Sequence, residues 1–145
     1  MENTQEREKQ IAAKAAQMML QARKLAGLKQ NLPASFSDAL VYLMKNQGMT
    51  KEALAERCKV EPITIQRLRN EYYEDLRLPL VVSLCIGLKL DTLVSNMLIQ
   101  KAGLSFQSSF RDCTYQVLLA NPPDDMDEAN ELLRINGLKP FGKEN

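Results

Sequence analysis

The sequence predicts an all-α protein with one main helical domain and helical additions at both ends. Apolar residues recur at the spacing of an amphipathic helix nearly throughout the chain. Runs of β-branched residues with strict alternation are missing, and no Asn-Gly or Asp-Gly turn lies between two alternating segments. With 145 residues, of which 45% are apolar, the chain is long enough to bury a core without a disulfide or a metal ion.

The first predicted helix covers residues 4–28 and carries a short apolar seam. The spacings within the seam alternate between four and three residues, the pattern of a coiled-coil interface, over about two heptads. Its members are Ile11, Ala15, Met18, Ala22 and Leu25. The seam could pack on the chain's own core, join a second copy or meet another partner, and the helix could also be flexible. Gly27, Asn31 and Pro33 are expected to end the helix and form a linker.

Five helices are predicted in the middle of the chain, and most have a recognisable start or stop. Thr50 and Asp91 are suited to N-cap positions, and Gly48 is suited to stop the helix before it. Pro79 fits the first turn of a helix, where its missing N–H costs nothing. The predicted ranges are Phe36–Gln47, Lys51–Lys59, Ile63–Glu74, Pro79–Ile86 and a last helix from Asp91 to Ala102.

Two more helices are predicted in the last third of the chain, on either side of an Asn-Pro-Pro turn. Asp125, followed by Glu128 three residues later, forms a pattern like a capping box at the start of the second helix. The predicted ranges are Ser108 or Ser109 to Leu119, and Asp125 to the Asn136-Gly137 pair.

Ample apolar surface on these last two helices is expected to pack back on the preceding ones, with a dimer or partner surface as the alternative. The residues concerned are Phe106, Phe110, Tyr115, Val117, Leu118, Leu119, Leu132, Leu133, Ile135 and Leu138. The expected organisation is an N-terminal arm at residues 1–33, a main domain at 34–103 and a C-terminal extension at 104–145.

Composition narrows the classes of function. Nineteen basic and 18 acidic residues give a net charge of +1, which argues against bulk packaging of nucleic acid. The absence of histidine removes every imidazole-based catalytic triad and the commonest metal ligand. There is no glycine-rich phosphate loop or nucleophile elbow. We therefore expect a protein that is not an enzyme and that uses no cofactor or metal.

The cysteines and the hydropathy pattern indicate the cellular compartment. Cys58, Cys85 and Cys113 are too scattered for a disulfide framework or a zinc site, and buried thiols in a reducing cytosol are expected. No apolar run approaches the roughly 20 residues of a membrane span, and the polar N-terminus lacks the layout of a signal peptide. A cytoplasmic protein without membrane contact is the expectation.

The most informative segment is residues 48–69, GMTKEALAERCKVEPITIQRLR. It predicts a short helix capped by Thr50, a tight turn at residues 59–61 and a second helix opened by Pro62. Ala55 is small enough to let the two helices cross closely, and Val60 is expected to plug the turn. Ile65, Leu68 and Tyr72 are expected to point inward from the second helix. Two short helices crossing through such a turn predict a helix-turn-helix.

Residues 36–93 resemble the xenobiotic-response-element-type family of prokaryotic helix-turn-helix domains, which have the repressor-like five-helix fold. The matching residues are Gly48-Met49-Thr50, Leu54-Ala55, Val60, Thr64-Ile65-x-Arg67-Leu68 and, further on, Ile86-Gly87-Leu88-Lys89-Leu90-Asp91-x-Leu93. The resemblance covers about 40% of the chain.

The resemblance implies that the second helix of the pair reads the major groove of double-stranded DNA. Thr50, Lys51 and Thr64 would contact phosphates. Gln66 and Arg67 would read base edges, because their donors match adenine and guanine respectively. The implied set is completed by Ile63, against a thymine methyl group, and Asn70, at the DNA backbone.

Several positions depart from the family pattern. Lys59 stands where glycine is usual, so that a lysine would adopt positive φ at a modest cost. Glu61 replaces the usual Ser or Thr cap and would repel phosphate, and Arg69 replaces an acidic residue. Residues 57–70 nevertheless hold four basic residues against Glu61 alone, a local charge of +3.

These observations predict a sequence-specific DNA-binding transcriptional regulator that acts as a homodimer and reads the major groove with helix 63–74. The alternative is a helix-turn-helix protein-interaction module, such as an antitoxin or a regulatory adaptor, that reads no bases. The apolar pair Pro62-Ile63 and the additional helices at both ends favour this alternative, because they could contact a protein partner.

Overall fold

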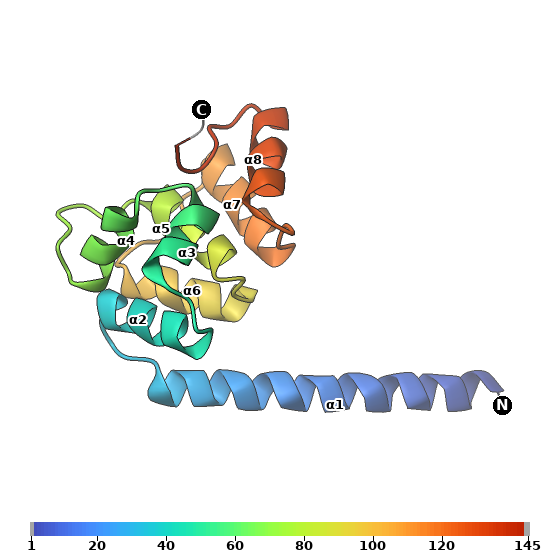
Figure 1. Ribbon diagram of the computed structural model, residues 1–145. Helices are drawn as coiled ribbons and strands as arrows, with labels where there is room; N and C mark the ends of the chain where they lie inside the picture. The colour runs from blue at the N-terminus through green and yellow to red at the C-terminus, as the bar shows by residue number, and fades with distance from the viewer. Residues whose placement is uncertain (1, 144–145) are drawn as a thin grey trace. The chain divides into compact units, whose positions relative to one another are not determined.

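A computed structural model of the chain describes residues 2–143, and in this part it contains eight helices and no strand (Figure 1). The all-α prediction is therefore confirmed. The described chain divides into two compact units, one ending at Leu32 and the other beginning at Pro33. Each unit is described by itself below.

The first unit is helix α1 (Glu2–Asn31), which is longer than the predicted range of 4–28. Gly27 lies inside α1 rather than at its end. A single glycine costs a helix about 1 kcal/mol, which the strong helix formers around it can offset. The helix ends two residues before Pro33, whose ring disfavours the helical conformation of the residue before it. Neither α1 nor any other described helix is long and apolar enough to cross a membrane.

Five helices form the centre of the second unit: α2 (Phe36–Asn46), α3 (Lys51–Cys58), α4 (Pro62–Arg69), α5 (Leu78–Gly87) and α6 (Thr92–Lys101). The side chains of Ser35, Thr50 and Asp91 accept hydrogen bonds from the first turns of α2, α3 and α6. Helix α5 is buried along most of its length and contacts α3, α6, α7 and α8. Each central helix contributes a fully buried side chain to the core: Leu40, Leu54, Ile65, Leu84 and Leu98.

Helix α4 ends at Arg69, so the prediction of a helix over 63–74 was wrong at its C-terminal end. The side-chain amide of Asn70 donates to the Gln66 carbonyl, and this local bond competes with further helix. Glu71 then adopts a φ of +63°, and the Tyr72 N–H donates to the Arg67 carbonyl. As a result Tyr72 leaves the helix and is 76% exposed, instead of pointing inward as predicted.

The last two helices, α7 (Phe110–Ala120) and α8 (Met126–Ile135), both pack on α5 (Figure 1). Ser109 and Asp125 cap them as the sequence predicts. The expectation that this extension folds back on the core is confirmed, with Tyr115, Leu118 and Leu133 buried. The burial is incomplete, because other apolar side chains of the extension are exposed: Phe110, Val117, Leu132 and Ile135.

The three cysteines differ in their surroundings. Cys58 and Cys85 are buried, and burial raises the pKa of each thiol to about 12, so both are uncharged. Cys113 is exposed, contrary to the expectation that all three are buried. It lies on the outer side of α7, where no core packing requires an apolar side chain.

Candidate nucleic-acid interface

The α3–α4 pair is joined by a turn that is closed by main-chain hydrogen bonds. Lys59 adopts the left-handed conformation, with φ 58° and ψ 42°, as expected from the resemblance described above, in which glycine is usual at this position. The Val60 N–H donates to the Ala55 carbonyl at 3.0 Å, which is the hydrogen-bond pattern of a helix ending in a left-handed residue. Val60 itself is only half-buried, so it plugs the turn less completely than predicted. A non-glycine residue in this conformation costs about 1 kcal/mol.

Helix α4 begins without a side-chain cap. Glu61 occupies the N-cap position but its carboxylate accepts no hydrogen bond there, in line with its expected weakness as a cap. Pro62 offsets part of this defect, because its ring fixes φ at a helical value and removes one unpaired N–H. Ile65 and Leu68 are buried, and the Ser37 hydroxyl donates to the Leu68 carbonyl at 2.6 Å. The inner face of α4 is therefore firmly attached to the core.

The outer face of α4 brings together four of the predicted DNA-contacting residues. Ile63, Arg67 and Asn70 are exposed and stand four and three residues apart, a spacing that places them on one side of a helix. Gln66 is half-exposed on the same side. Asn70 is already engaged through its amide nitrogen at the Gln66 carbonyl, 2.9 Å away, so it acts first as a helix stop.

The remaining three predicted residues lie elsewhere. Thr64 is half-buried on the flank of α4. Thr50 is exposed and caps α3, with its hydroxyl accepting the Ala53 N–H at 3.1 Å, and the half-exposed Lys51 follows it. Because α3 has eight residues, Thr50 is about 12 Å along the helix from the turn that leads into α4.

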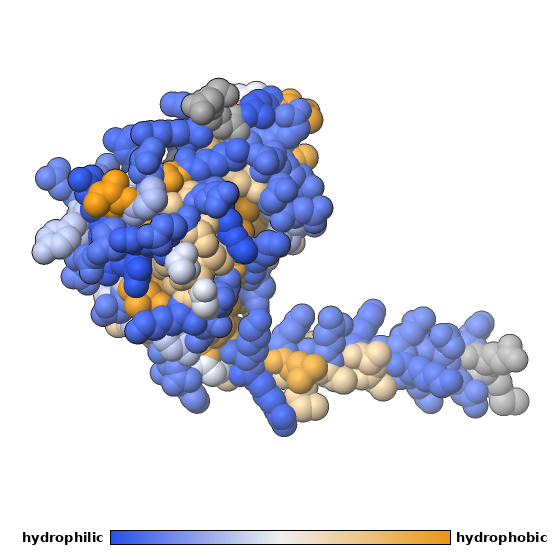
Figure 2. Space-filling model, viewed as in Figure 1, coloured by the Kyte–Doolittle hydropathy of each residue, from blue (hydrophilic) through white to orange (hydrophobic). Residues whose placement is uncertain are grey.

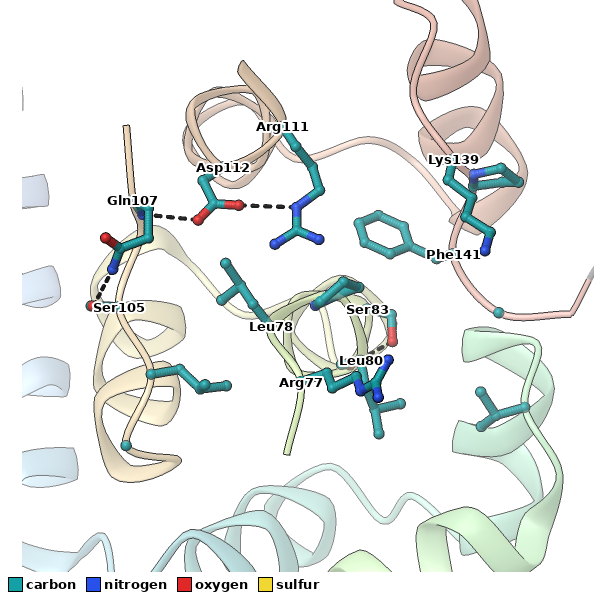
Figure 3. Close-up of a pocket in the computed structure, with 16 residues that line it drawn as sticks. Arg77, Leu78, Leu80, Ser83, Ser105, Gln107, Arg111, Asp112, Lys139 and Phe141 are labelled. Atoms are coloured by element: carbon teal, nitrogen blue, oxygen red, sulfur yellow. Dashed lines mark hydrogen bonds and ion pairs between the residues drawn. The ribbon is translucent and has the colours of Figure 1, made fainter. Parts of the chain in front are cut away.

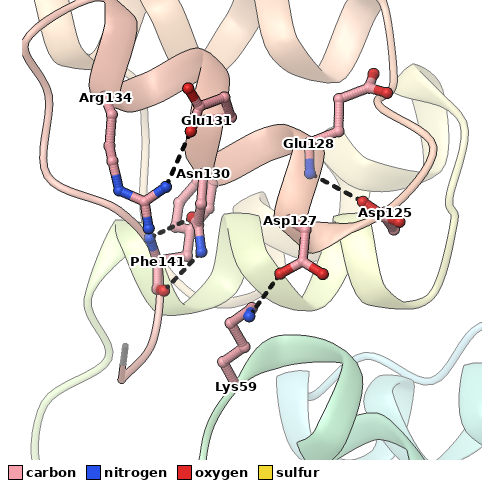
Figure 4. A network of polar contacts seen from close by, with 8 residues as sticks. All are labelled: Lys59, Asp125, Asp127, Glu128, Asn130, Glu131, Arg134 and Phe141. Carbon is pink, nitrogen blue, oxygen red and sulfur yellow. Dashed lines mark hydrogen bonds and ion pairs between the residues drawn. The ribbon is translucent and has the colours of Figure 1, made fainter. Parts of the chain in front are cut away.

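An acidic residue that the sequence analysis did not associate with this site lies against the turn. The Lys59 Nζ is 2.6 Å from the Asp127 Oδ1, at the start of α8 (Figure 4). The hydrogen bond and the charge of Lys59 lower the pKa of Asp127, so this carboxylate stays ionised. Including Asp127 lowers the local charge from +3 to +2.

Two other basic residues lie near the turn. Arg57 is exposed and donates to the Gly87 carbonyl at 3.2 Å, whereas Arg69 is half-buried and its buried Nε has no hydrogen-bond partner. Arg67 is left as the exposed basic side chain on the outer face of α4. The outer face of α4 therefore presents one guanidinium, two side-chain amides and one apolar side chain.

The C-terminal segment also reaches the turn. The Lys143 N–H donates to the Lys59 carbonyl at 2.8 Å. Gly142 has a φ of +69°, and a Cβ on it would lie 2.6 Å from the carbonyl oxygens of Cys58 and Lys59. Only glycine fits both this conformation and this close approach.

Asn130 anchors the same segment to α8. Its amide oxygen accepts the Phe141 N–H at 2.7 Å, and its amide nitrogen donates to the Phe141 carbonyl at 3.2 Å (Figure 4). The Phe141 ring is buried 5.2 Å from the Tyr115 ring, centroid to centroid. The end of the described chain is thus a strap, residues 139–143, between α8 and the α3–α4 turn.

Sequence reasoning missed both the strap and Asp127, because each depends on contacts between residues far apart in the chain. A polar residue at an inward position of α8, Asn130, was the available signal for a specific partner. No protein-family model matches this chain, and neither the curated proteins nor the solved structures yield a match.

Proposed function

We propose that this protein is a sequence-specific DNA-binding transcriptional regulator in which α2–α6 form a repressor-like helix-turn-helix domain. One observation carries the proposal: α4 is a short helix with a buried inner face and with Ile63, Gln66, Arg67 and Asn70 together on its outer face. A helix fixed to a core on one side, with donors on the other, suits insertion into a major groove.

In this proposal the residues divide into two roles. Arg67 reads a guanine and Gln66 an adenine, because their paired donors and acceptors match those base edges. Ile63, which is 52% exposed, contacts a thymine methyl group. Lys51 and the N-terminus of α3 hold a phosphate, which fixes the register but reads no sequence.

The protein acts on DNA as a homodimer, with α1 as the element that pairs the two copies. The α1 seam alternates large side chains with alanines, and its large members Ile11 and Met18 are exposed. Figure 2 shows apolar surface along the middle of α1. In an antiparallel pair, Met18 lies opposite Ala15 of the second copy, and Ile11 lies opposite its Ala22. Such pairing of large with small fills the middle of the interface evenly, whereas a parallel pair would set alanine against alanine there.

The charges along α1 favour the same orientation. Residues 2–9 contain three acidic and two basic residues, whereas residues 23–29 contain three basic residues and none that is acidic. An antiparallel pair places the acidic end of each copy beside the basic end of the other. A parallel pair would bring the two basic ends together, which costs free energy through like-charge repulsion.

Duplex binding by single variants tests the reading role of α4. On a duplex that the wild type selects from a random pool, Arg67→Ala should weaken binding by about 1–3 kcal/mol and relax the preference at one base pair. Lys51→Ala should weaken binding to all duplexes alike and reduce the salt dependence. Lys45→Ala, an exposed lysine at the end of α2, is the matched control and should change neither property.

The second candidate function is a protein-interaction module without base reading. It is favoured by the apolar Pro62-Ile63 start of α4, by the neutralising contact of Asp127 with Lys59, and by the exposed apolar side chains of α7 and α8. If Arg67→Ala and Ile63→Ala both leave duplex binding unchanged, groove reading by α4 is rejected in favour of this second function.

A further inference from the structure

A groove of about 820 Å³ lies between the central helices and the C-terminal extension (Figure 3). Its walls come from four parts of the second unit: the start of α5, the loop after α6, the start of α7 and the strap. Val60 of the α3–α4 turn completes the lining. Grooves of this size accommodate small organic molecules.

One basic side chain in the groove is held in place by a buried carboxylate. Asp112 is only 2% exposed, and its oxygens accept the Gln107 N–H at 2.8 Å and the Arg111 Nε–H at 3.0 Å. The Arg111 guanidinium also lies 5.6 Å from the centroid of the Tyr115 ring. Its two remaining nitrogens point into the groove (Figure 3). An arginine fixed in this way loses little conformational freedom when it binds an anion.

The rest of the lining combines positive charge with apolar surface. Arg77 and Lys139 join Arg111, and the one carboxylate in the lining, Asp112, is occupied by its bonds inside the protein. The apolar surface of the lining comes from the half-buried Leu80 and Leu104, and behind it are the buried side chains of Leu78 and Phe141. The groove is therefore complementary to a molecule with a negative head and an apolar body.

We infer that this groove binds a small organic anion, with its carboxylate, phosphate or sulfonate head on Arg111 and Lys139 and its apolar body against the half-buried side chains of Leu80 and Leu104. Arg77 is paired with Asp75 at 3.3 Å and Arg111 with Asp112 at 3.0 Å, so no carboxylate of the lining is free to pair with a cation. An inorganic anion would leave the apolar walls exposed to water. This inference does not depend on DNA binding.

A ligand in the groove would also stabilise the α3–α4 turn. Lys139 and Phe141 belong to the strap, whose Lys143 N–H is bonded to the Lys59 carbonyl. A head group bound by both Arg111 and Lys139 would connect α7 to the strap. The strap is itself hydrogen-bonded to the α3–α4 turn through Lys143. Binding should therefore slow amide hydrogen exchange at Val60 and Lys143.

Titration calorimetry with the full chain and three probes tests the inference. Sodium octanoate supplies both an anionic head and an apolar body. Octylammonium supplies the same body with a positive head, and inorganic phosphate supplies the charge alone. Octanoate should bind saturably and about tenfold or more tightly than either control probe, because only octanoate satisfies both parts of the lining.

Variants assign the binding to the groove. Arg111→Gln and Lys139→Gln should each weaken octanoate binding by about tenfold, whereas Lys45→Gln should leave it unchanged. Because Arg111→Gln leaves the buried Asp112 without its partner, the exposed Lys139 provides the variant that keeps the fold. Equal binding of octanoate and octylammonium, equal binding of octanoate and phosphate, or octanoate binding unchanged in Lys139→Gln would overturn the inference.

Discussion

Lys59 and Asp127 connect the α3–α4 turn to the first turn of α8, with 2.6 Å between the Lys59 Nζ and the Asp127 Oδ1. The pair has two effects on the proposed DNA-binding surface. It holds a lysine that already lies in an unfavourable backbone conformation, and it neutralises a positive charge beside the start of α4. The C-terminal extension is therefore part of the electrostatics of the proposed reading helix.

Removing the acidic partner should strengthen duplex binding. In Asp127→Asn, no carboxylate offsets the charge of Lys59 near the phosphates, so affinity at low salt should rise and the log–log salt slope should steepen by up to about 1. Stability should change little, because the Asp127 side chain is 78% exposed and pairs of this kind are screened by water. Fluorescence anisotropy over a salt series measures both the affinity and the slope.

Glu131→Gln is the control for this experiment. It also removes a carboxylate of α8 from an exposed ion pair, the one with Arg134, and it should leave the salt slope unchanged. An unchanged slope in Asp127→Asn would show that Lys59 does not approach the phosphates.

The close contact between the strap and the α3–α4 turn leads to a separate prediction about the free energy of unfolding. Gly142→Ala should destabilise the protein by about 2–4 kcal/mol, because it adds both a strained φ of +69° and a clash with two carbonyl oxygens. Gly137→Ala shares the positive φ, +73°, but its Cβ would meet nothing within 4 Å. It should cost only about 1 kcal/mol. Urea denaturation of the two variants compares these costs, and equal costs would argue against a close contact between the strap and the turn.

Local patterns were sufficient to predict most of the fold. Thr50, Asp91 and Asp125 cap their helices as expected, because a cap depends on residues within one turn. The positive φ of Lys59 was expected from the family resemblance, because glycine is usual at this position of the turn. The C-terminal end of α4 could not be predicted from a local pattern, because the apolar spacing continues to Tyr72 while the backbone leaves the helix at Asn70.

The site was only partly predictable for a related reason. The face of α4 follows from helical spacing, so Ile63 and Arg67 could be placed together from the sequence. The net charge of the site could not be predicted from the sequence, because it depends on Asp127, which folding brings to Lys59 from a distant part of the chain. Counting charges along the sequence therefore overestimated the basic character of this surface.

The buried carboxylate of the groove predicts a dependence of stability on pH. Burial opposes the ionisation of Asp112, but the hydrogen bonds from the Gln107 N–H and Arg111 outweigh it and lower its pKa below the ordinary 3.8. A lowered pKa in the folded state stabilises the protein above the ordinary value, and this contribution is lost as pH falls through the folded-state pKa.

Asp112→Asn should therefore be less stable than the wild type at pH 7, by about 1–3 kcal/mol. The difference should narrow as pH falls below about 4. Thermal unfolding between pH 7 and pH 2 checks both statements, with the exposed Asp38→Asn as the control. A difference that stays constant over this range would mean that the Asp112 carboxylate is not held ionised by its partners.

The antiparallel pairing of α1 can be tested by a distance between two copies. A spin label on Gln5→Cys, in a Cys113→Ser background that removes the exposed native thiol, should report about 35 Å between copies, because Gln5 lies opposite Leu28 of the second copy. A parallel pair would give about 10 Å. A short distance, or a monomeric mass by light scattering, would refute antiparallel pairing.

Selection from random duplexes with the purified full chain at low salt tests whether the outer face of α4 reads DNA sequence. We expect enrichment of a near-palindrome whose half-sites are about 34 Å apart, and a changed base preference when Arg67→Ala is used. Failure to bind any duplex at low salt, or an identical selected sequence for the wild type and Arg67→Ala, would contradict base reading by α4.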